Sequence, residues 1–249
     1  MPYSDFTIEK VKTAFNLTID ETKVLFPDFP LTQPSFLLNE WLRQYAPLAT
    51  AINTEKARSE FLIAPVLAEV RSQLEGKVAL FSGVDFADHI LEVTSSACKL
   101  HGRLPPVSNC CKRFCGSENV DASAGLTGFC DFLFSASSEQ LYIDAPVVAV
   151  VEAKNENIKA GLGQCIAEMV AAQTFNAQKA AASLEVASSE HFSGGDRNIE
   201  TIYGVVTTGE IWKFLTLDVH TVVIDRQTFY IADIEKILGV FLLILGNGT

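Results

Sequence analysis

The sequence predicts one mixed α/β domain, and three observations indicate it. Apolar residues recur at helical spacing in the first third of the chain. Apolar runs of strand length dominate the middle, and a hairpin pattern followed by an apolar helix ends the chain. This order of segments fits a sheet covered by helices, and 249 residues are enough to bury a large core.

Helices are expected before the first strand. Residues 35–52 place apolar side chains at helical spacing, namely Phe36, Leu37, Trp41, Tyr45 and Leu48. Thr54 is the candidate N-cap of a second helix that extends to about Leu74. Pro65 should kink that helix or mark a boundary in it, because proline has no N–H to donate.

Two boundaries divide the chain. Residues 1–34 are polar and proline-containing, which predicts a short helix or an extended arm. We therefore separate residues 1–53, an N-terminal arm and helix, from residues 54–249, the main domain. Within the main domain, residues 87–124 show no apolar period and are expected to form an inserted loop.

Strands are expected on both sides of this loop. Residues 78–86 precede it, and residues 126–135 follow it as an apolar strand that Asp131 interrupts. The segment VVAVVEAKN after Pro146 is apolar on both faces, which predicts a central strand. An alanine-rich helix is expected over about residues 158–182.

The end of the chain predicts a hairpin and a helix. Thr208-Gly209 separates two apolar strand segments, residues 201–207 and 211–217, which is a hairpin signature. Residues 231–245 have apolar side chains at helical spacing and should form a terminal helix that faces the core.

The chain is acidic, with a net charge of -11 and a pI near 4.8. Proteins that bind nucleic acid usually carry a basic face, so this charge is the main observation against such a function. The N-terminus lacks the apolar core of a secretory signal, and the longest apolar stretch, Ile237–Leu245, falls short of the roughly 20 residues that span a bilayer. We expect a cytoplasmic protein with reduced cysteines and no membrane segment.

Four of the six cysteines lie in the segment Cys98–Cys115, together with His101. They could supply zinc ligands, but their spacing is not that of a zinc finger, and the adjacent pair Cys110-Cys111 is unusual for one. We predict that the segment is not a structural zinc site. It also holds the densest group of basic residues, which could contact a phosphate backbone but more simply forms a solvated loop.

The residues that carry chemistry are Asp131, Glu152 and Lys154. Side chains alternate along a strand, so Glu152 and Lys154 point to the same side of it, near the carboxyl end where α/β sheets usually bind ligands. Asp131 lies in a neighbouring strand segment. Two carboxylates beside one ammonium suit Mg²⁺, which prefers oxygen ligands and activates a bound water toward a phosphoryl group.

The alternative is that these are ordinary charges at strand ends, since a Glu-x-Lys triplet also arises by chance. Three observations weigh against it. The charges interrupt apolar strands, where an unpaired charge is costly. Gln164 lies in the first turns of the next helix, and Glu60 lies on an upstream helix.

In this order the motifs resemble the PD-(D/E)XK nuclease superfamily: Glu60 on a helix, G-x-x-D-F around Asp131, V-V-E-A-K, and G-x-x-Q ending at Gln164. The nearest resemblance is to the nuclease region at the N-terminus of type I restriction enzyme motor subunits and to their stand-alone relatives. The late segment YGVVTTGEIWKFLTL is similar to the pattern G-V-x-T-[NT]-G-x-x-W-x-F of that family. The resemblance covers about residues 54–245.

The resemblance implies a restriction-endonuclease-like three-layer α/β fold, with a mixed central sheet flanked by helices. It also implies Asp131 and Glu152 as ligands of Mg²⁺ (or Mn²⁺), Lys154 as the catalytic lysine, Glu60 as a supporting acid and Gln164 as a positioning residue. The sequence departs from the family at the inserted loop, which directly precedes the Asp131 strand, so the local geometry of Asp131 can differ from that of the family.

The sequence thus favours a metal-dependent phosphodiesterase, an endo- or exonuclease that acts on DNA. Its DNA affinity should be weak and salt-sensitive because the chain is acidic, and a protein partner could deliver the substrate. The alternative is a catalytically silent module of the same fold that serves binding or assembly. The acidity favours that module, and the intact trio of charges favours the enzyme. A repair or RNA-directed role with the same chemistry is the third hypothesis.

Overall fold

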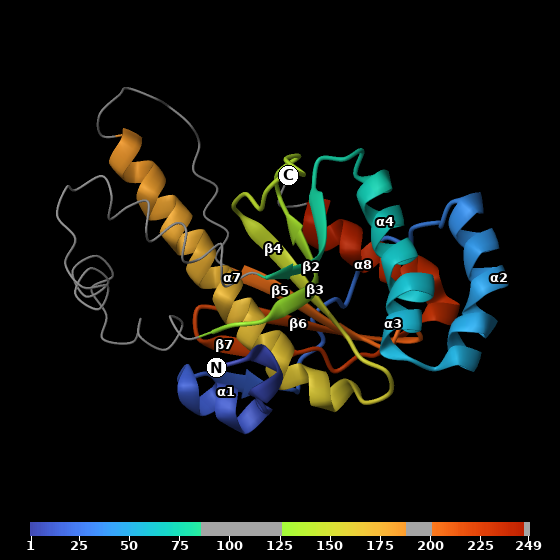
Figure 1. Cartoon of the computed structure of the whole chain (residues 1–249), viewed down its shortest axis with the longest axis horizontal. Coiled ribbons are helices and arrows are strands. Elements are labelled where there is room, and N and C mark those ends of the chain that lie inside the picture. Colours follow the sequence, from blue (N-terminus) through green and yellow to red (C-terminus); the bar gives the residue numbers. More distant parts are fainter. Residues whose placement is uncertain (86–125, 188–200, 247–249) are drawn as a thin grey trace.

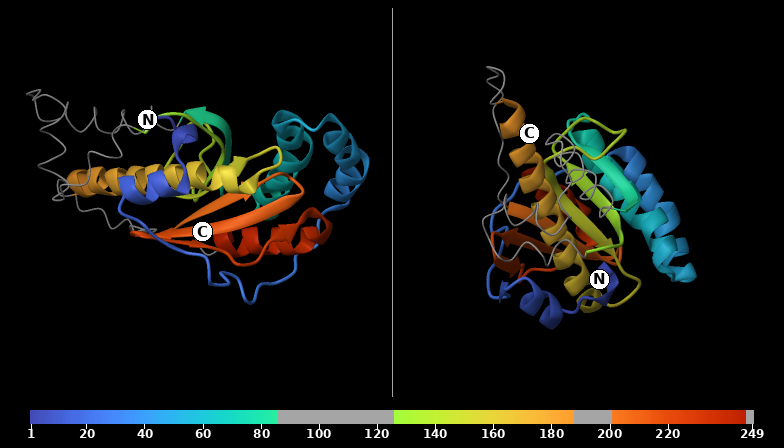
Figure 2. Two further views of the ribbon diagram at one scale, coloured as in Figure 1. Left: turned by 90° about the horizontal axis from the view of Figure 1, so that it is seen from below. Right: turned by 60° about the vertical axis from the view of Figure 1, so that its left-hand side comes forward.

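The computed structural model describes residues 1–85, 126–187 and 201–246, and it has the mixed α/β architecture that the sequence predicts (Figure 1). Within these residues one eight-stranded sheet forms the middle of the molecule. Helices cover both faces of the sheet, and two apolar clusters fill the spaces between the layers (Figure 2).

In the described residues the strands follow the order β1-β7-β6-β5-β4-β3-β2, and β8 pairs with β6. The strands are β1 Thr18–Asp20, β2 Ala79–Asp85, β3 Phe129–Ser135, β4 Val147–Ala153, β5 Thr201–Thr207, β6 Ile211–Asp218, β7 Thr221–Ile224 and β8 Phe229–Tyr230. β4 pairs in parallel with β5, and β1 with β7, while the other neighbours are antiparallel. The sheet is therefore mixed.

β4 is an interior strand, with β3 on one side and β5 on the other. Every residue from Val147 to Ala153 is buried. The prediction of a central strand is confirmed. A continuous apolar run favours this position, because both of its faces can be covered without burying a polar side chain. Only Glu152 breaks that run.

The predicted hairpin is also confirmed, because β5 and β6 pair antiparallel around Thr208-Gly209. Gly209 has a φ of +81°, which a residue with a Cβ rarely adopts. Leu62 packs so closely against this turn that a Cβ at position 209 would lie 2.7 Å from the Leu62 Cβ. The hairpin turn is thus held against the helical segment that precedes the sheet.

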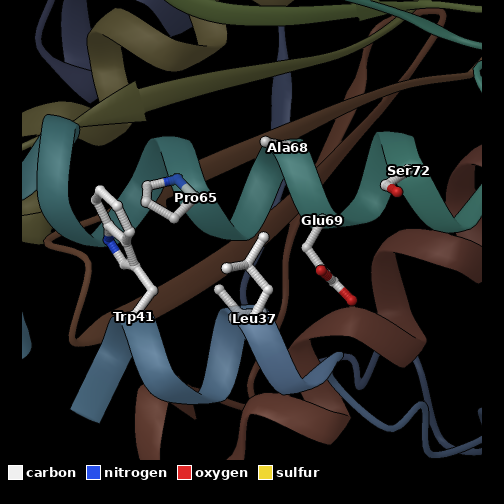
Figure 3. Close-up of a pocket in the computed structure, with 7 residues that line it drawn as sticks. Leu37, Trp41, Pro65, Ala68, Glu69 and Ser72 are labelled. Atoms are coloured by element: carbon white, nitrogen blue, oxygen red, sulfur yellow. The ribbon is translucent and has the colours of Figure 1, made fainter. Parts of the chain in front are cut away.

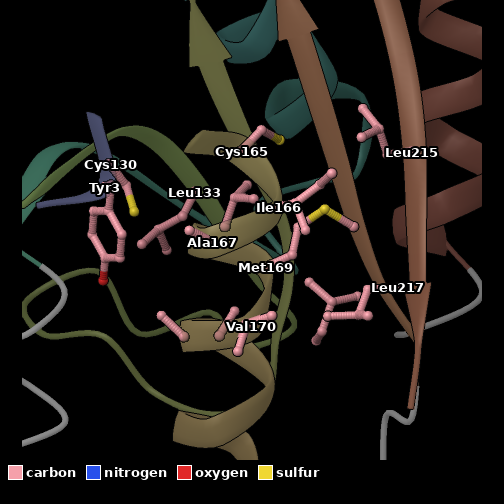
Figure 4. Packing of buried hydrophobic residues seen from close by; sticks show 14 of the residues in the cluster. Tyr3, Cys130, Leu133, Cys165, Ile166, Ala167, Met169, Val170, Leu215 and Leu217 are labelled. Atoms are coloured by element: carbon pink, nitrogen blue, oxygen red, sulfur yellow. The ribbon is translucent and has the colours of Figure 1, made fainter. Parts of the chain in front are cut away.

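One face of the sheet is covered by the long helix α7 (Ile158–Ala187), with α1 (Ile8–Ala14) packed beside it. Ile166 and Met169 of α7 are fully buried against the strands, where they meet Leu215 of β6 (Figure 4). The apolar face of α7 thus holds the helix against the sheet, directly over β4 and β5.

The other face is covered by α4 (Ala64–Gln73) and the terminal helix α8 (Ile234–Gly246). Phe241 of α8 packs edge-on against Trp212 and Phe214 of β6, with ring centroids 5.9 and 5.4 Å apart. The predicted core-facing terminal helix is confirmed by these aromatic contacts.

The helix predicted from Thr54 begins there, because the Thr54 side chain accepts a hydrogen bond from the N–H of Ala57 at 3.2 Å. It does not continue as one regular helix. A short α-helix, α3 (Glu55–Arg58), is followed by a π-helical turn, η2 (Ser59–Ile63), and then by α4.

Pro65 explains this interruption. It has no N–H to offer the carbonyl of Phe61 four residues earlier. The indole N–H of Trp41 donates to that carbonyl instead, at 3.0 Å. The predicted boundary at Pro65 is confirmed, and a neighbouring helix satisfies the carbonyl that the proline leaves without a partner.

That neighbouring helix is α2 (Phe36–Ile52), and only some of its apolar residues are buried. Phe36 and Leu37 are 82 % and 74 % exposed, while Leu38 and Ala49 are buried. The predicted helix is confirmed, and two of the apolar residues that indicated it, Phe36 and Leu37, face solvent. The helix lies at the periphery against η2 and α4, so only a narrow stripe of it can be covered.

A groove runs between α2 and α4 (Figure 3). Leu37 and Trp41 line it from α2, and Pro65, Ala68 and Glu69 line it from α4. Its surface is therefore mainly apolar, with one carboxylate at the edge. The groove lies on the α4 and α8 side of the molecule, away from α7.

The N-terminal segment belongs to the same folded body as the rest of the chain. β1 extends the sheet by pairing with β7. Tyr3 and Phe6 are buried in the α7-side cluster, and Phe26 is buried in the other cluster. Residues 1–53 therefore pack against the sheet, because their aromatic side chains are part of both apolar clusters.

The predicted inserted loop, residues 87–124, lies entirely outside the described residues, and so does the segment Cys98–Cys115 with its zinc prediction. Across residues 1–85, 126–187 and 201–246, no helix combines the length and apolarity that crossing a membrane requires.

Candidate active site

The candidate site lies where β4 ends. Glu152 and Lys154 point to the same side of the strand, as predicted, and the ammonium of Lys154 donates a hydrogen bond to Oε1 of Glu152. The backbone N–H of Lys154 donates to the carbonyl of Thr207 on β5 at 2.8 Å. Parallel pairing with β5 therefore fixes the backbone that carries both charged side chains.

Asp131 lies on β3, the antiparallel neighbour of β4. Phe132 pairs with Val151, and one more step along this register brings Asp131 opposite Glu152. Oδ2 of Asp131 accepts a hydrogen bond from the backbone N–H of Ala153 at 2.8 Å. The structure thus brings together the two carboxyls predicted as metal ligands and the predicted catalytic lysine.

Gln164 reaches the same cluster from α7. Its amide oxygen accepts a hydrogen bond from the Lys154 ammonium at 3.3 Å, and its amide nitrogen donates to Oε1 of Glu168 at 3.1 Å. Glu168 is fully buried and was not predicted as a site residue. Its signal in the sequence is its position, four residues after Gln164 and surrounded by the apolar residues that anchor α7.

Close approach of α7 to β4 depends on Gly161. A Cβ at this position would lie 2.7 Å from a methyl carbon of Val206 and 3.0 Å from Cγ of Lys154. Gly163, two residues later, lies against the backbone of Phe6 and Thr7 in the N-terminal segment. The first glycine makes room for the lysine stem, and the second makes room for the N-terminal support.

Glu60 is not brought to this cluster. Its side chain is 54 % exposed and pairs with Lys56 one helical turn earlier, at 3.0 Å. The acid of the upstream helix that acts on Lys154 is instead Glu55, whose charge raises the pKa of the lysine. Glu55 lies at the start of α3, whereas Glu60 lies in the π-helical turn that follows it.

Glu152 is a carboxyl in an apolar environment. Burial, followed by the charge of Asp131, raises the pKa of Glu152 to about 8, although Lys154 acts in the opposite direction. Its side chain is only 1 % exposed. A carboxyl in this state binds a proton or a cation more readily than a solvated one does.

Glu168 has the same character. Burial raises the pKa of Glu168 well above its ordinary value, the charge of Glu152 adds to this, and the hydrogen bond from Gln164 acts against it. For Lys154, burial lowers the pKa, but Glu152, Glu55 and Asp131 outweigh burial and the net shift is upward. Lys154 is therefore a cation at neutral pH.

Two oxygens of this cluster, Oε2 of Glu152 and Oε2 of Glu168, receive no hydrogen bond from a fixed donor. The two carboxyls lie close enough to share a proton, which acts to lower the pKa of Glu152 and to raise the pKa of Glu168. Buried carboxylate oxygens without a donor are costly, and a bound cation or proton would satisfy them. Mg²⁺ is typically held by one or two protein carboxylates and keeps several waters, so Asp131 and Glu152 fit such an ion. In the described part of the chain, no group of three or more His, Cys, Asp or Glu side chains is arranged to hold a metal.

The loop after β4 is fixed by Arg58, which is only 5 % exposed. Its guanidinium donates to Asn155 in that loop, to Asn53 before α3, and to the Thr208 carbonyl and the Glu210 carboxylate in the β5–β6 turn, at 2.9 to 3.4 Å. Sequence reasoning did not identify it. A single buried guanidinium thus ties three loops together beside Lys154.

Thiolate chemistry is disfavoured at this site. Cys130 and Cys165 are both buried beside the carboxyls. Burial, with the neighbouring Glu168 charge, raises the pKa of both thiols well above the ordinary value. Both thiols therefore stay protonated at neutral pH, and they contribute to packing and not to nucleophilic chemistry.

The cluster meets solvent through Lys154, 19 % exposed, and through the partly exposed Asp131. A ligand would therefore reach the lysine and Asp131 first. Two carboxyls and an ammonium in this order can hold a divalent cation and place positive charge beside it. No family model, no curated protein and no solved structure matches the chain.

Proposed function

We propose that the protein is a Mg²⁺- or Mn²⁺-dependent phosphodiesterase that acts on DNA, with the restriction-endonuclease-like fold of the PD-(D/E)XK superfamily. The observation that supports it most is the convergence of Asp131, Glu152 and Lys154 at the end of an interior strand. Gln164 joins them from the following helix. These four residues come from three separate parts of the chain, so chance charges at strand ends do not account for their meeting.

In this proposal Asp131 and Glu152 hold the cation. The bound cation supplies a Lewis acid and a water that ionises near neutral pH. Lys154, which stays protonated, neutralises charge that develops on the phosphate as the bond breaks. Gln164 and Glu152 hold the lysine in place from two sides.

The net charge of -11 predicts weak binding of DNA that falls steeply with added salt. A protein partner that delivers the substrate would compensate for this weakness. Assays therefore belong at low ionic strength.

The test compares Lys154→Ala with the wild-type protein on single-stranded, duplex and branched DNA, with Mg²⁺ or Mn²⁺. Lys154→Ala should lose turnover while it still binds the metal, since lysine is not a ligand. Asp131→Ala should lose both. Lys236→Ala is the matched control, because Lys236 also forms an ion pair with a nearby carboxylate but lies on α8. If the wild-type protein leaves every substrate intact, the nuclease proposal fails.

The second candidate is a catalytically silent module of the same fold that serves binding or assembly. One observation favours it: Glu152 is almost fully buried and its charge is already matched by Lys154. In that case the pair is a structural ion pair. Divalent metal should then leave the melting temperature unchanged, whereas a working site should be stabilised by it.

A further inference from the structure

Glu168 has no role in the function proposed above, although it lies against the site. It is fully buried on α7, and the hydrogen bond that it accepts comes from the amide of Gln164. Its second oxygen receives no hydrogen bond from a fixed donor, and the carboxyl lies close enough to Glu152 to share a proton with it. A carboxyl in such a place is costly to bury, and nothing in the packing of α7 requires one, since Ile166, Ala167 and Met169 around it are apolar.

The chemistry of Gln164 explains what the carboxyl does. A glutamine amide has one accepting end and one donating end, and it can turn over between them. Oε1 of Glu168 accepts from the donating end of Gln164. It can accept whether or not the other oxygen carries a proton, and that other oxygen lies on the side of Glu152. The accepting end then faces Lys154, whose ammonium only donates.

We propose that Glu168 is a positioning residue of this site: it fixes the Gln164 amide so that the amide oxygen holds the Lys154 ammonium beside Glu152. The four side chains form a connected path, from Glu152 to Lys154 to Gln164 to Glu168. The consequence for catalysis rests on the proposed nuclease function, whereas the orientation of the amide does not.

Removal of the carboxyl has a specific consequence. In Glu168→Leu the Gln164 amide nitrogen loses its acceptor, so the amide is no longer held from its far end and its oxygen can move away from Lys154. The lysine then keeps only Glu152 as a partner. Loss of a hydrogen bond in a path to a charged group should lower kcat roughly ten- to hundredfold, while KM for DNA stays similar because Glu168 does not reach the surface.

Glu168→Gln is the conservative variant. The oxygen of the new amide can still accept from Gln164, and its nitrogen can donate to the nearby carboxyl of Glu152 in place of the shared proton. We therefore expect Glu168→Gln to restore the orientation of Gln164. A carboxyl that served only to fill space would be replaced equally well by Leu and by Gln.

The chain offers a matched control on α4. Gln73 donates from its amide nitrogen to Glu69 at 2.7 Å, which is also a Glu–Gln pair four residues apart on a helix. This pair lies on the α8 side of the sheet. Glu69→Leu removes one of the two acceptors of the Gln73 amide nitrogen, the other being the Gln33 carbonyl, and it also removes the acceptor of Ser35. It should leave the Gln164 amide and turnover as in the wild-type protein.

The experiment records the side-chain amide resonances of glutamine in nitrogen-15-labelled full-length protein, with Gln164 assigned by its loss in Gln164→Leu. The Gln164 signal should shift in Glu168→Leu, return toward its wild-type position in Glu168→Gln, and stay in place in Glu69→Leu. An unshifted Gln164 signal in Glu168→Leu would overturn the proposal, and so would a Glu168→Gln spectrum equal to that of Glu168→Leu. Thermal denaturation of each variant establishes that it is folded.

Kinetics then separates the two proposals. If wild-type protein cleaves DNA and Glu168→Leu retains the wild-type kcat, the positioning role fails while the nuclease function stands. If no variant cleaves DNA but the Gln164 signal responds as expected, the nuclease function fails and the positioning of Gln164 stands.

Discussion

Lys154 donates to Glu152 from two residues further along β4, and the carboxyl is the more deeply buried partner. The two halves of this pair are therefore not equivalent. Loss of the lysine removes a hydrogen bond to a buried carboxyl and the counter-charge that it needs when it ionises, which is costly. Loss of the carboxyl leaves an ammonium that is partly exposed and that water can solvate. The same pair thus gives different stability effects depending on which residue is replaced.

The first prediction concerns metal binding. Glu152→Ala should weaken Mn²⁺ binding and leave thermal stability similar or higher, because it removes one of the neighbouring carboxyls whose charges repel. Lys154→Met should keep Mn²⁺ binding but lower the melting temperature. Titration with Mn²⁺ and thermal denaturation of both variants check this. Equal Mn²⁺ affinity in the wild-type protein, Glu152→Ala and Asp131→Ala would show that the metal assignment is wrong.

The second prediction is that the metal-free protein loses stability between about pH 5 and pH 8. The pKa of Glu152 is raised to about 8 and that of Glu168 is also raised, by burial first in both cases. In this window the folded state holds protons that the unfolded state has released, so the free energy of unfolding falls as the pH rises.

Urea unfolding at several pH values measures this effect. Glu168→Gln should flatten the dependence, since an amide does not titrate, and Glu69→Gln should leave it unchanged, because the pKa of Glu69 is lowered and its effect falls at more acidic pH. A wild-type stability that rises from pH 5 to pH 8 would contradict the raised pKa values. Mn²⁺ should bind more tightly as the pH rises, because the proton on Glu152 competes with the ion.

The sequence predicted the features that depend on local pattern. Glu152 and Lys154 share a side because a strand alternates, Thr54 caps its helix because of its side-chain oxygen, and β4 is central because its apolar run is continuous. The position of Asp131 opposite Glu152 was predicted only through the motif order, since register between β3 and β4 is a long-range property.

The features that were missed depend on tertiary packing. Periodicity predicted the helix α2 but cannot show that it lies at the periphery, where Phe36 and Leu37 are exposed. The acid of the upstream helix whose charge acts on Lys154 is Glu55, whereas the predicted Glu60 pairs with Lys56. Glu168 looked like an ordinary helix charge, because only the fold places it beneath β4.

The third prediction tests the π-helical turn. Trp41→Phe should destabilise the protein by about 1 kcal/mol, because the Phe61 carbonyl loses the indole donor. In a Pro65→Ala background the cost should be smaller, since the introduced alanine has an N–H that can donate to the same carbonyl. A double-mutant cycle by urea unfolding measures the coupling, and strict additivity would mean that Trp41 does not substitute for the missing N–H of Pro65.

The fourth prediction concerns the space that Gly161 leaves for Lys154. A Cβ at position 161 would lie 2.7 Å from a methyl carbon of Val206 and 3.0 Å from Cγ of Lys154. Both are side-chain atoms, so they can yield, but the lysine must then leave its place between Glu152 and Gln164. Alanine also favours a helix interior over glycine by roughly 0.5–1 kcal/mol. Gly161→Ala should therefore change stability by less than about 1 kcal/mol while it lowers kcat.

Gly163→Ala is the informative contrast. At this position the added Cβ meets the backbone of Phe6 and Thr7, which cannot move aside as a side chain does. Overpacking of this kind costs about 1–3 kcal/mol, so Gly163→Ala should be the less stable variant. Gly246→Ala serves as the neutral reference, because a Cβ there meets no atom within 4 Å. If Gly161→Ala loses stability as Gly163→Ala does and its folded fraction keeps the wild-type kcat, then Gly161 serves packing and does not set the position of Lys154.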